Sequence, residues 1–184
     1  MIKKTFLILA TLLCMPAVAS TAPAPQRFST LALTAGGILK VAPFEGACLP
    51  GANIITADWC YHPHHWWGVG AKMSYWFSPF LLGYKDRNDV GLHEIPVTAY
   101  LRGIAGSGGN VQAYASVGGG FVAVLGMMGL GVVGAMEAEV GLNATISERT
   151  KFTTAARYLA YGHPSVGICP IGTADFRVGV SFEI

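Results

Sequence analysis

The chain contains 184 residues, of which 52% are hydrophobic and 12% are charged, and its formal net charge is +2 at pH 7. This length suits a single domain, and a near-neutral chain without a basic run argues against a nucleic-acid partner. The most apolar later stretch, 117–136, is interrupted by glycines, so it does not resemble a membrane-spanning helix. Two explanations remain: a soluble β-protein with a large core, or a barrel whose apolar face meets lipid.

The first residues have the features of a secretory signal peptide. Two lysines precede an apolar run over residues 6–15, and Ala17-Val18-Ala19 before Ser20 forms a small-x-small cleavage site. The apolar run is too short to span a bilayer comfortably, which argues against a retained anchor. We expect residues 1–19 to be the signal peptide and residues 20–184 to be the exported protein.

Residues 27–41 and 52–62 are the first two strand candidates, and they show the weakest alternation of apolar and polar residues. The exported chain keeps three cysteines, Cys48, Cys60 and Cys169. An oxidising periplasm permits a disulfide, and the pair closest in sequence is Cys48 and Cys60. Three thiols allow three pairings and always leave one over, and three unpaired thiols are the alternative.

The following segments alternate clearly, as strands do when successive side chains point to opposite faces. Apolar residues take every second position in 67–77, 95–101 and 111–121. The intervening positions carry polar residues such as Lys72, Glu94, Arg102 and Gln112.

The segment 134–146 decides which face is which. Apolar residues such as Met136 and Val140 alternate with Glu137 and Glu139. A charge that faces lipid in the middle of a strand costs about 2–4 kcal/mol. Both glutamates are therefore predicted to face the interior of a barrel.

Residues 152–158 and 175–184 continue the alternation and complete a count of eight strands. An even count places both termini on one side. Short reversals at 62–65, 104–110 and 147–150 would face the periplasm, and longer ones at 42–51, 78–91, 125–132 and 162–173 would face outward. The sequence thus predicts an all-β, eight-stranded antiparallel transmembrane β-barrel behind an N-terminal signal peptide.

A soluble, lipocalin-like barrel or sandwich would show the same alternation with the solvent inverted. The composition favours the membrane, because the polar face carries many Gly, Ser and Thr and few charges, whereas strands facing water usually carry more Lys and Glu. Several aromatic residues lie near predicted strand ends, where a membrane barrel has aromatic girdles. They are Trp66, Trp67, Trp76, Phe77, Tyr158 and Tyr161.

Residues 95–102, the Gly-rich turn after them and residues 113–120 resemble the family of small, porin-like bacterial outer-membrane β-barrel domains. Residues 141–150 and 156–158 resemble the strand–turn–strand unit of that family, and the resemblance covers about 66–184. The last eight residues are similar to the signal read by barrel-insertion machinery, with Gly179, Phe182 and a final Ile184 in place of the commoner Phe. The resemblance implies an outer-membrane monomer in contact with lipid and lipopolysaccharide, assembled by periplasmic chaperones and the barrel-assembly machinery.

The predicted interior carries four basic and four acidic residues. They are Lys72, Arg102, Arg157 and Arg177 against Glu94, Glu137, Glu139 and Asp175. Unpaired buried charges are strongly unfavourable, so these groups should pair. An eight-stranded barrel is just wide enough for its side chains to fill. We therefore expect a filled lumen, and the alternative is a narrow polar path for ions or small solutes.

One motif points to chemistry. His163-Pro164-Ser165 lies before the last strand, and Asp175 follows. This order is similar to the C-terminal arrangement of outer-membrane lipid A 3-O-deacylases, which implies Ser165 as nucleophile, His163 as base and Asp175 as the residue that orients the base. Val166 stands where that family has Asn. The alternative is an ordinary surface loop.

His62, His64 and His65, with Cys60 and Cys169, are residue types that bind zinc or copper. A solvated turn is the simpler interpretation, and we expect neither a metal nor a cofactor. The leading hypothesis is a non-enzymatic surface scaffold whose short outer loops, which include the apolar stretches 80–84 and 125–130, contact lipid or an apolar partner.

Overall fold

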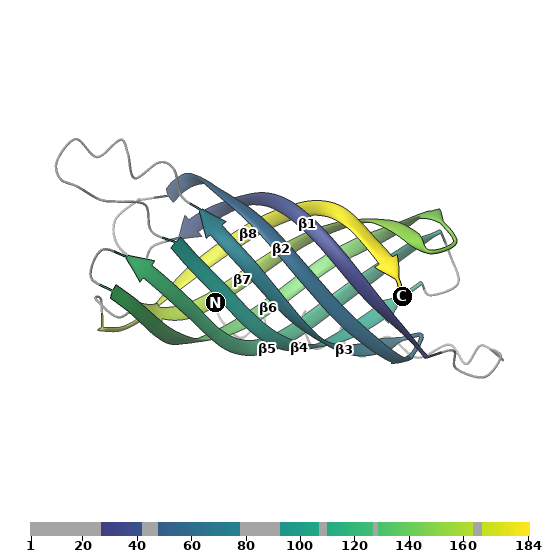
Figure 1. Cartoon of the computed structure of the whole chain (residues 1–184), viewed down its shortest axis with the longest axis horizontal. Helices are drawn as coiled ribbons and strands as arrows, with labels where there is room; N and C mark the ends of the chain where they lie inside the picture. The colour runs from purple at the N-terminus through teal and green to yellow at the C-terminus, as the bar shows by residue number, and fades with distance from the viewer. Residues whose placement is uncertain (1–26, 42–47, 78–92, 107–109, 127–128, 164–166) are drawn as a thin grey trace, which may run out of the picture.

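The computed structural model describes residues 27–41, 48–77, 93–106, 110–126, 129–163 and 167–184. Within these residues, eight strands form one closed antiparallel barrel in which β1 also pairs with β8 (Figure 1). The strands are β1 Phe28–Val41, β2 Cys48–His64, β3 Trp67–Phe77, β4 His93–Ala105, β5 Val111–Gly126, β6 Gly129–Ser147, β7 Thr150–His163 and β8 Gly167–Glu183. The predicted eight-stranded antiparallel barrel is confirmed.

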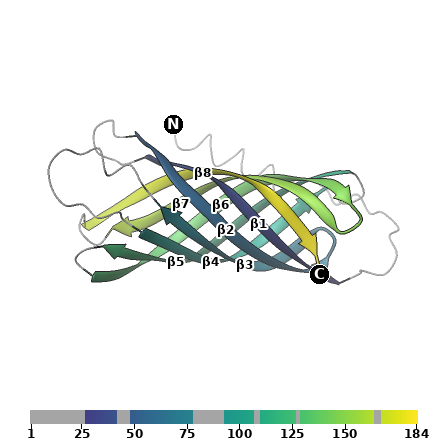
Figure 2. The ribbon, with the colours of Figure 1, turned by 45° about the horizontal axis from the view of Figure 1, so that its top comes forward.

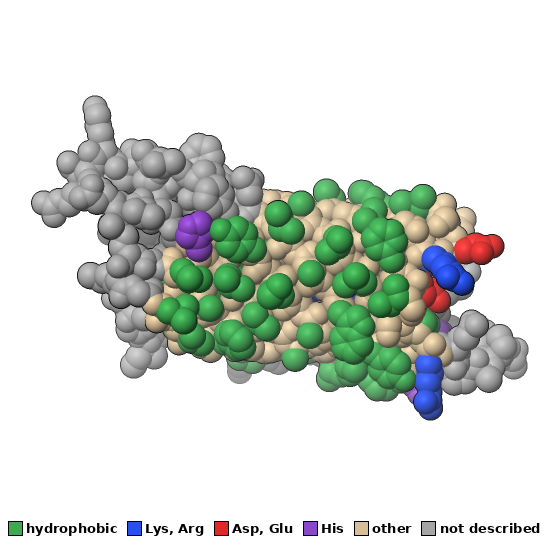
Figure 3. Space-filling model, in the orientation of Figure 1, with side chains coloured by type: hydrophobic (Ala, Val, Ile, Leu, Met, Phe, Trp, Pro, Cys, Tyr) green, Lys and Arg blue, Asp and Glu red, His purple; other side chains and the backbone are tan. Residues whose placement is uncertain are grey.

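The wall of the barrel is polar inside and apolar outside. In β6, Glu137 and Glu139 are 5% and 3% exposed, whereas Met136 between Ala135 and Glu137 is 73% exposed. Hydrophobic side chains cover the visible wall in Figure 3, and the described Lys, Arg, Asp and Glu side chains on that face gather at one end. A barrel folded in water has the opposite arrangement, with its apolar side chains inside.

The two ends of the barrel differ in how the strands are joined. β1 begins and β8 ends at the right-hand end of Figure 1, which we call the terminal end, and Figure 2 shows the same arrangement from another side. Two-residue turns at 65–66 and 148–149 join strands there. At the opposite end, called the loop end, the strands are joined through residues 42–47, 78–92, 127–128 and 164–166, which lie outside the described residues.

Two of the predicted long connections are wrong, because the strands continue through them. β5 extends to Gly126 and β6 begins at Gly129, so most of 125–132 belongs to strands. Likewise β7 reaches His163 and β8 begins at Gly167 within the predicted loop 162–173. The glycines of these stretches lie within the strand ladders of the wall. β2 also starts earlier than predicted, at Cys48.

Residues 1–26 lie outside the described residues, so the signal peptide over residues 1–19 stays a prediction. Among the described residues, no helix has the length and apolar character needed to cross a membrane.

The tight curvature of the wall brings aromatic rings against inward-facing glycines. A Cβ atom added at Gly141 in β6 would collide with the Tyr114 ring and with the carbonyl oxygen of Thr154. We therefore expect Gly141→Ala to destabilise the barrel by about 1–3 kcal/mol, the usual cost of overpacking, measured by urea unfolding in lipid vesicles. Gly134 in the same strand is the matched control, because a Cβ added there meets no atom within 4 Å. Equal stability of the two alanine variants would contradict the expectation.

Candidate functional site: the charged interior of the barrel

Charged side chains from six strands converge in the middle of the barrel interior. All of them are buried. They are Asp58 of β2, Lys72 of β3, Arg102 of β4, Glu137 and Glu139 of β6, Arg157 of β7, and Asp175 and Arg177 of β8. We call these eight residues the ion-pair network. Seven of them were candidates from the sequence, and the register of the barrel brings these seven together with Asp58.

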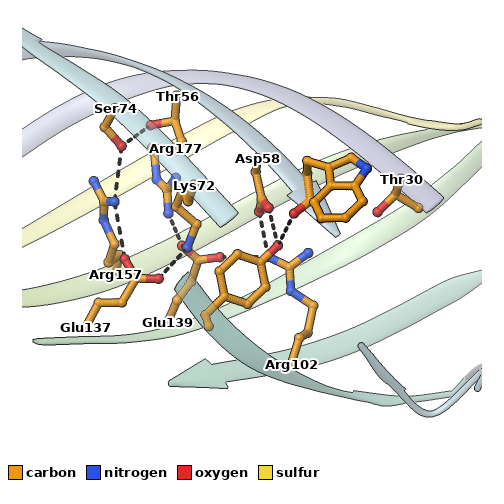
Figure 4. Close-up of polar contacts among 12 residues, drawn as sticks. Thr30, Thr56, Asp58, Lys72, Ser74, Arg102, Glu137, Glu139, Arg157 and Arg177 are labelled. Atoms are coloured by element: carbon orange, nitrogen blue, oxygen red, sulfur yellow. Dashed lines mark hydrogen bonds and ion pairs between the residues drawn. The ribbon is translucent and has the colours of Figure 1, made fainter. Parts of the chain in front are cut away.

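Glu139 is the centre of the network. Its carboxylate accepts a hydrogen bond from Lys72 Nζ at 2.7 Å, lies 3.4 Å from a terminal nitrogen of Arg102, and pairs with Arg177. Figure 4 shows the Lys72 side chain of β3 and the Arg177 side chain of β8 meeting near this carboxylate. One carboxylate therefore contacts three cations. Its removal would leave each of these cations with a single carboxylate partner.

A second group of ion pairs extends the network towards β7 and β8. Asp175 accepts hydrogen bonds from Arg157 Nε at 2.7 Å and from Arg177 Nε at 2.8 Å. Glu137 contacts Lys72 Nζ at 2.9 Å and Arg157 at 3.5 Å. Each of the four cations thus contacts two carboxylates. Buried charges require partners of opposite charge in this way, because an unpaired buried charge is strongly unfavourable.

Asp58 is the member that the sequence analysis missed. It accepts hydrogen bonds from Arg102 at 2.6 Å and from the Tyr100 hydroxyl. The Arg102 guanidinium also lies between the rings of Tyr100 and Tyr114, at 4.7 and 4.3 Å from their centroids. The available signal was the alternation of residues 54–62, which places Asp58 on the same face as Ile54 and Cys60.

An apolar layer lies on the loop-end side of the network. We call it the apolar septum. It consists of Ile54, Trp76, Val122, Val124, Ala135, Leu159 and Tyr161. Glu94 reaches this level from β4, where it accepts a hydrogen bond of 3.0 Å from the Tyr161 hydroxyl. Glu94 is therefore buried as expected, and its hydrogen bond with Tyr161 joins it to the septum.

The septum corrects the prediction of an aromatic girdle. Trp76 and Tyr161 point into the barrel and are each 2% exposed. Their positions alternate in phase with Lys72 and Arg157, so the period of the strand places them inside. Trp66 and Tyr158 do lie on the outer surface. The side chain of Phe77 is outside the described residues.

The proposed set of Ser165, His163 and Asp175 does not form around Asp175. Arg157 pairs with Asp175 in the β7–β8 ladder, whereas His163 pairs with Gly167. At about 3.3 Å per residue, these two levels lie about 20 Å apart along the strands. Asp175 is buried and paired with two arginines, so its predicted role in orienting His163 is wrong. Ser165 and the side chain of His163 lie outside the described residues.

The predicted disulfide between Cys48 and Cys60 is also wrong. Both cysteines lie in β2, and Cys48 is its first residue. An extended strand rises about 3.3 Å per residue, which places their Cα atoms about 40 Å apart, and a disulfide requires about 7 Å or less. Cys60 is a free, buried thiol.

The histidines around the β2–β3 turn are divided between two environments. His62 is buried and shares a hydrogen bond of 3.1 Å with the Thr30 hydroxyl. His64 and His65 are exposed, and the side chain of Cys169 is outside the described residues. Within the described part of the chain, no three His, Cys, Asp or Glu side chains come close enough to hold a metal ion.

The predicted barrel-insertion signal lies on β8 beside β1. Gly179 faces the interior against the backbone of β1, and a Cβ added there would collide with the carbonyl oxygen of Leu33. Phe182 and Ile184 point outward and are exposed. The recognition of these residues by insertion machinery stays a prediction.

No known family model matches this sequence, and no curated protein matches it. Solved structures do share its fold. Neisserial surface protein A superposes with a TM-score of 0.63 at 11% identity, over 85% of this chain and 97% of that chain. The N-terminal β-barrel domain of Pseudomonas aeruginosa OprF gives 0.57 at 13% identity, over 86% and 100%. Ail, the attachment invasion locus protein of Yersinia pestis, gives 0.55 at 12% identity, over 86% and 99%.

All three matched structures are bacterial outer-membrane β-barrels, and identities this low establish a shared fold alone. The chain therefore has the fold of the small, eight-stranded outer-membrane barrels.

Proposed function

We propose that this protein is an integral barrel of the bacterial outer membrane that acts as a non-enzymatic, non-conducting scaffold. The barrel anchors the connections at its loop end, which face the cell exterior, and its terminal end faces the periplasm. The signal peptide over residues 1–19 supplies export, and the last strand supplies the insertion signal.

The observation that carries this proposal is the inverted wall. Exposed apolar side chains follow the outer face of the wall, for example from Leu130 to Ile146 in β6 and from Phe176 to Phe182 in β8. A monomeric protein in water rarely exposes apolar patches of more than a few hundred Å². The hydrocarbon core of a bilayer surrounds such a wall without the unfavourable free energy of apolar surface in water. The closed barrel also leaves no strand edge unpaired in lipid.

The filled interior favours a scaffold function rather than a pore function. The ion-pair network and the apolar septum together occupy the barrel with buried side chains from seven of the eight strands. Asp175 is engaged by two arginines, which supports a non-enzymatic role against the esterase alternative. Outer-membrane lipid and lipopolysaccharide are the partners that an apolar wall would contact. We expect a monomer, because the closed barrel leaves no strand edge for a second copy to pair with.

Fractionation and electrophoresis test the proposal. The mature protein should partition with outer membranes, require detergent for extraction, and migrate faster on a gel when unheated than when boiled. Purified barrels added to a planar phospholipid bilayer in concentrated KCl should produce no current steps. A protein that stays soluble without detergent would refute the membrane assignment, and steady current steps would refute the non-conducting role.

A further inference from the structure

The interior of the barrel is layered along its axis. In β3, Lys72 belongs to the ion-pair network and Trp76 to the septum, and Trp76 lies nearer the loop end. In β7 the order is the same, because Leu159 follows Arg157 towards the loop end. β2 and β6 repeat this order, with Ile54 and Ala135 nearer the loop end than the charged residues of their strands.

The septum is a closely packed layer, and the Glu94 carboxylate at its level is held by the Tyr161 hydroxyl. Leu159 and Val122 are 0% exposed, and Ile54 is 1% exposed. The rings of Trp76 and Tyr161 meet edge to face with their centroids 6.2 Å apart. Since the members come from β2, β3, β5, β6 and β7 and pack into one cluster, the side chains extend across the barrel and not along one wall.

The network lies directly against the septum. The Arg157 guanidinium is 5.6 Å from the centroid of the Trp76 ring. At the level of the network, the buried hydroxyls of Thr98 and Ser116 have no hydrogen-bond partner among the described residues. Buried polar atoms of this kind usually bind water, so the level of the network is compatible with hydration.

Towards the terminal end, the interior is polar. Thr153 and Ser181 are buried there, and Lys151 Nζ donates a hydrogen bond of 2.9 Å to the partly exposed Gln112 side chain. An ion that enters from the terminal end would therefore meet hydroxyl, amide and charged groups before it meets any apolar layer. The loop-end side of the network has the septum in its place.

We infer that the apolar septum, and not the ion-pair network, is the barrier that closes this barrel to ions. The inference rests on the proposed non-conducting function and identifies the residues responsible for it. Polar and charged groups can replace the hydration shell of an ion, whereas an apolar constriction excludes both ion and water. The septum consequently blocks the passage of ions, whereas the network contributes to the stability of the fold.

Conductance of truncated variants tests this inference. Trp76→Ala and Leu159→Ala, alone and together, shorten the septum, whereas Met136→Ala removes a comparable apolar side chain from the outer face of the same barrel. Glu139→Gln alters the network and keeps its volume. Each variant is refolded, checked for the fast-migrating unheated band, and added to a planar phospholipid bilayer in concentrated KCl.

The double septum variant should produce discrete current steps that are absent from the wild type, from Met136→Ala and from Glu139→Gln. If Trp76→Ala fails to give the folded band, Val122→Ala with Leu159→Ala takes its place. A folded septum variant as silent as Met136→Ala would overturn the inference, as would Glu139→Gln steps of the same size as those of the septum variants.

The result also separates the inference from the proposed function. A silent wild type with silent septum variants refutes only the inference. A wild type that conducts refutes the non-conducting role, and the inference then survives only if septum truncation enlarges the steps and Glu139→Gln does not.

Discussion

Replacement of Glu139 by leucine should destabilise the barrel by about 3–5 kcal/mol, the usual cost of breaking a buried ion pair from one side. Glu139 pairs with Lys72, Arg102 and Arg177, so its loss leaves three buried cations with less negative charge. Urea unfolding in lipid vesicles, followed by tryptophan fluorescence, measures the change in the free energy of unfolding.

Val140→Leu is the control for this measurement. Val140 is the next residue in β6 and faces outward, so a similar apolar side chain there should change stability by roughly 0.5 kcal/mol or less. Equal stability of Glu139→Leu and Val140→Leu would show that the network contributes nothing net to the fold.

The second large effect is expected on the outer face of the same strand. Val140 lies near the middle of β6 and is 57% exposed. In a bilayer, Val140→Arg places a charge close to the hydrocarbon midplane and should cost about 2–4 kcal/mol. In a water-soluble barrel, the same substitution would place an arginine in solvent and cost little. The free energy of unfolding of this variant therefore distinguishes a membrane barrel from a water-soluble barrel.

Ile146→Arg supplies the matched comparison, because Ile146 lies on the same face of β6 next to its terminal-end turn. At the membrane interface an arginine costs about 0–1 kcal/mol. A depth-dependent difference between the two arginine variants, measured in the same vesicles, is the expected signature of lipid contact. Equal costs at both positions would exclude a bilayer around this wall.

The fold could be predicted from the sequence because the side-chain period of a strand is local. Glu137 and Glu139 among alternating apolar residues were enough to assign the inner face of β6, and the burial of both confirms that assignment. The same period also placed Trp76 and Tyr161 inside. The prediction for these two residues followed the aromatic-girdle hypothesis in place of the strand period, because aromatic residues near strand ends are common at membrane interfaces.

The contacts inside the barrel were beyond sequence reasoning, because they depend on register around a closed wall. Glu139 and Arg177 are separated by 38 positions, and Lys72 and Glu137 by 65. No local pattern brings them together. Asp58 was missed for a related reason, since its strand alternates weakly outside residues 54–62. The disulfide prediction was wrong because both cysteines lie in one extended strand, where twelve positions in sequence correspond to a long distance in space.

The pairing of β1 with β8, from Thr30 with Glu183 to Val41 with Gly172, has a kinetic consequence. These are the first and last strands, so their ladder joins the residues farthest apart in the chain, and such non-local contacts form slowly. Until they meet, the sheet has two open edges whose backbone groups would each cost several kcal/mol in hydrocarbon. In a membrane, we therefore expect entry into the bilayer and the pairing of β1 with β8 to be coupled, and this step to be slow.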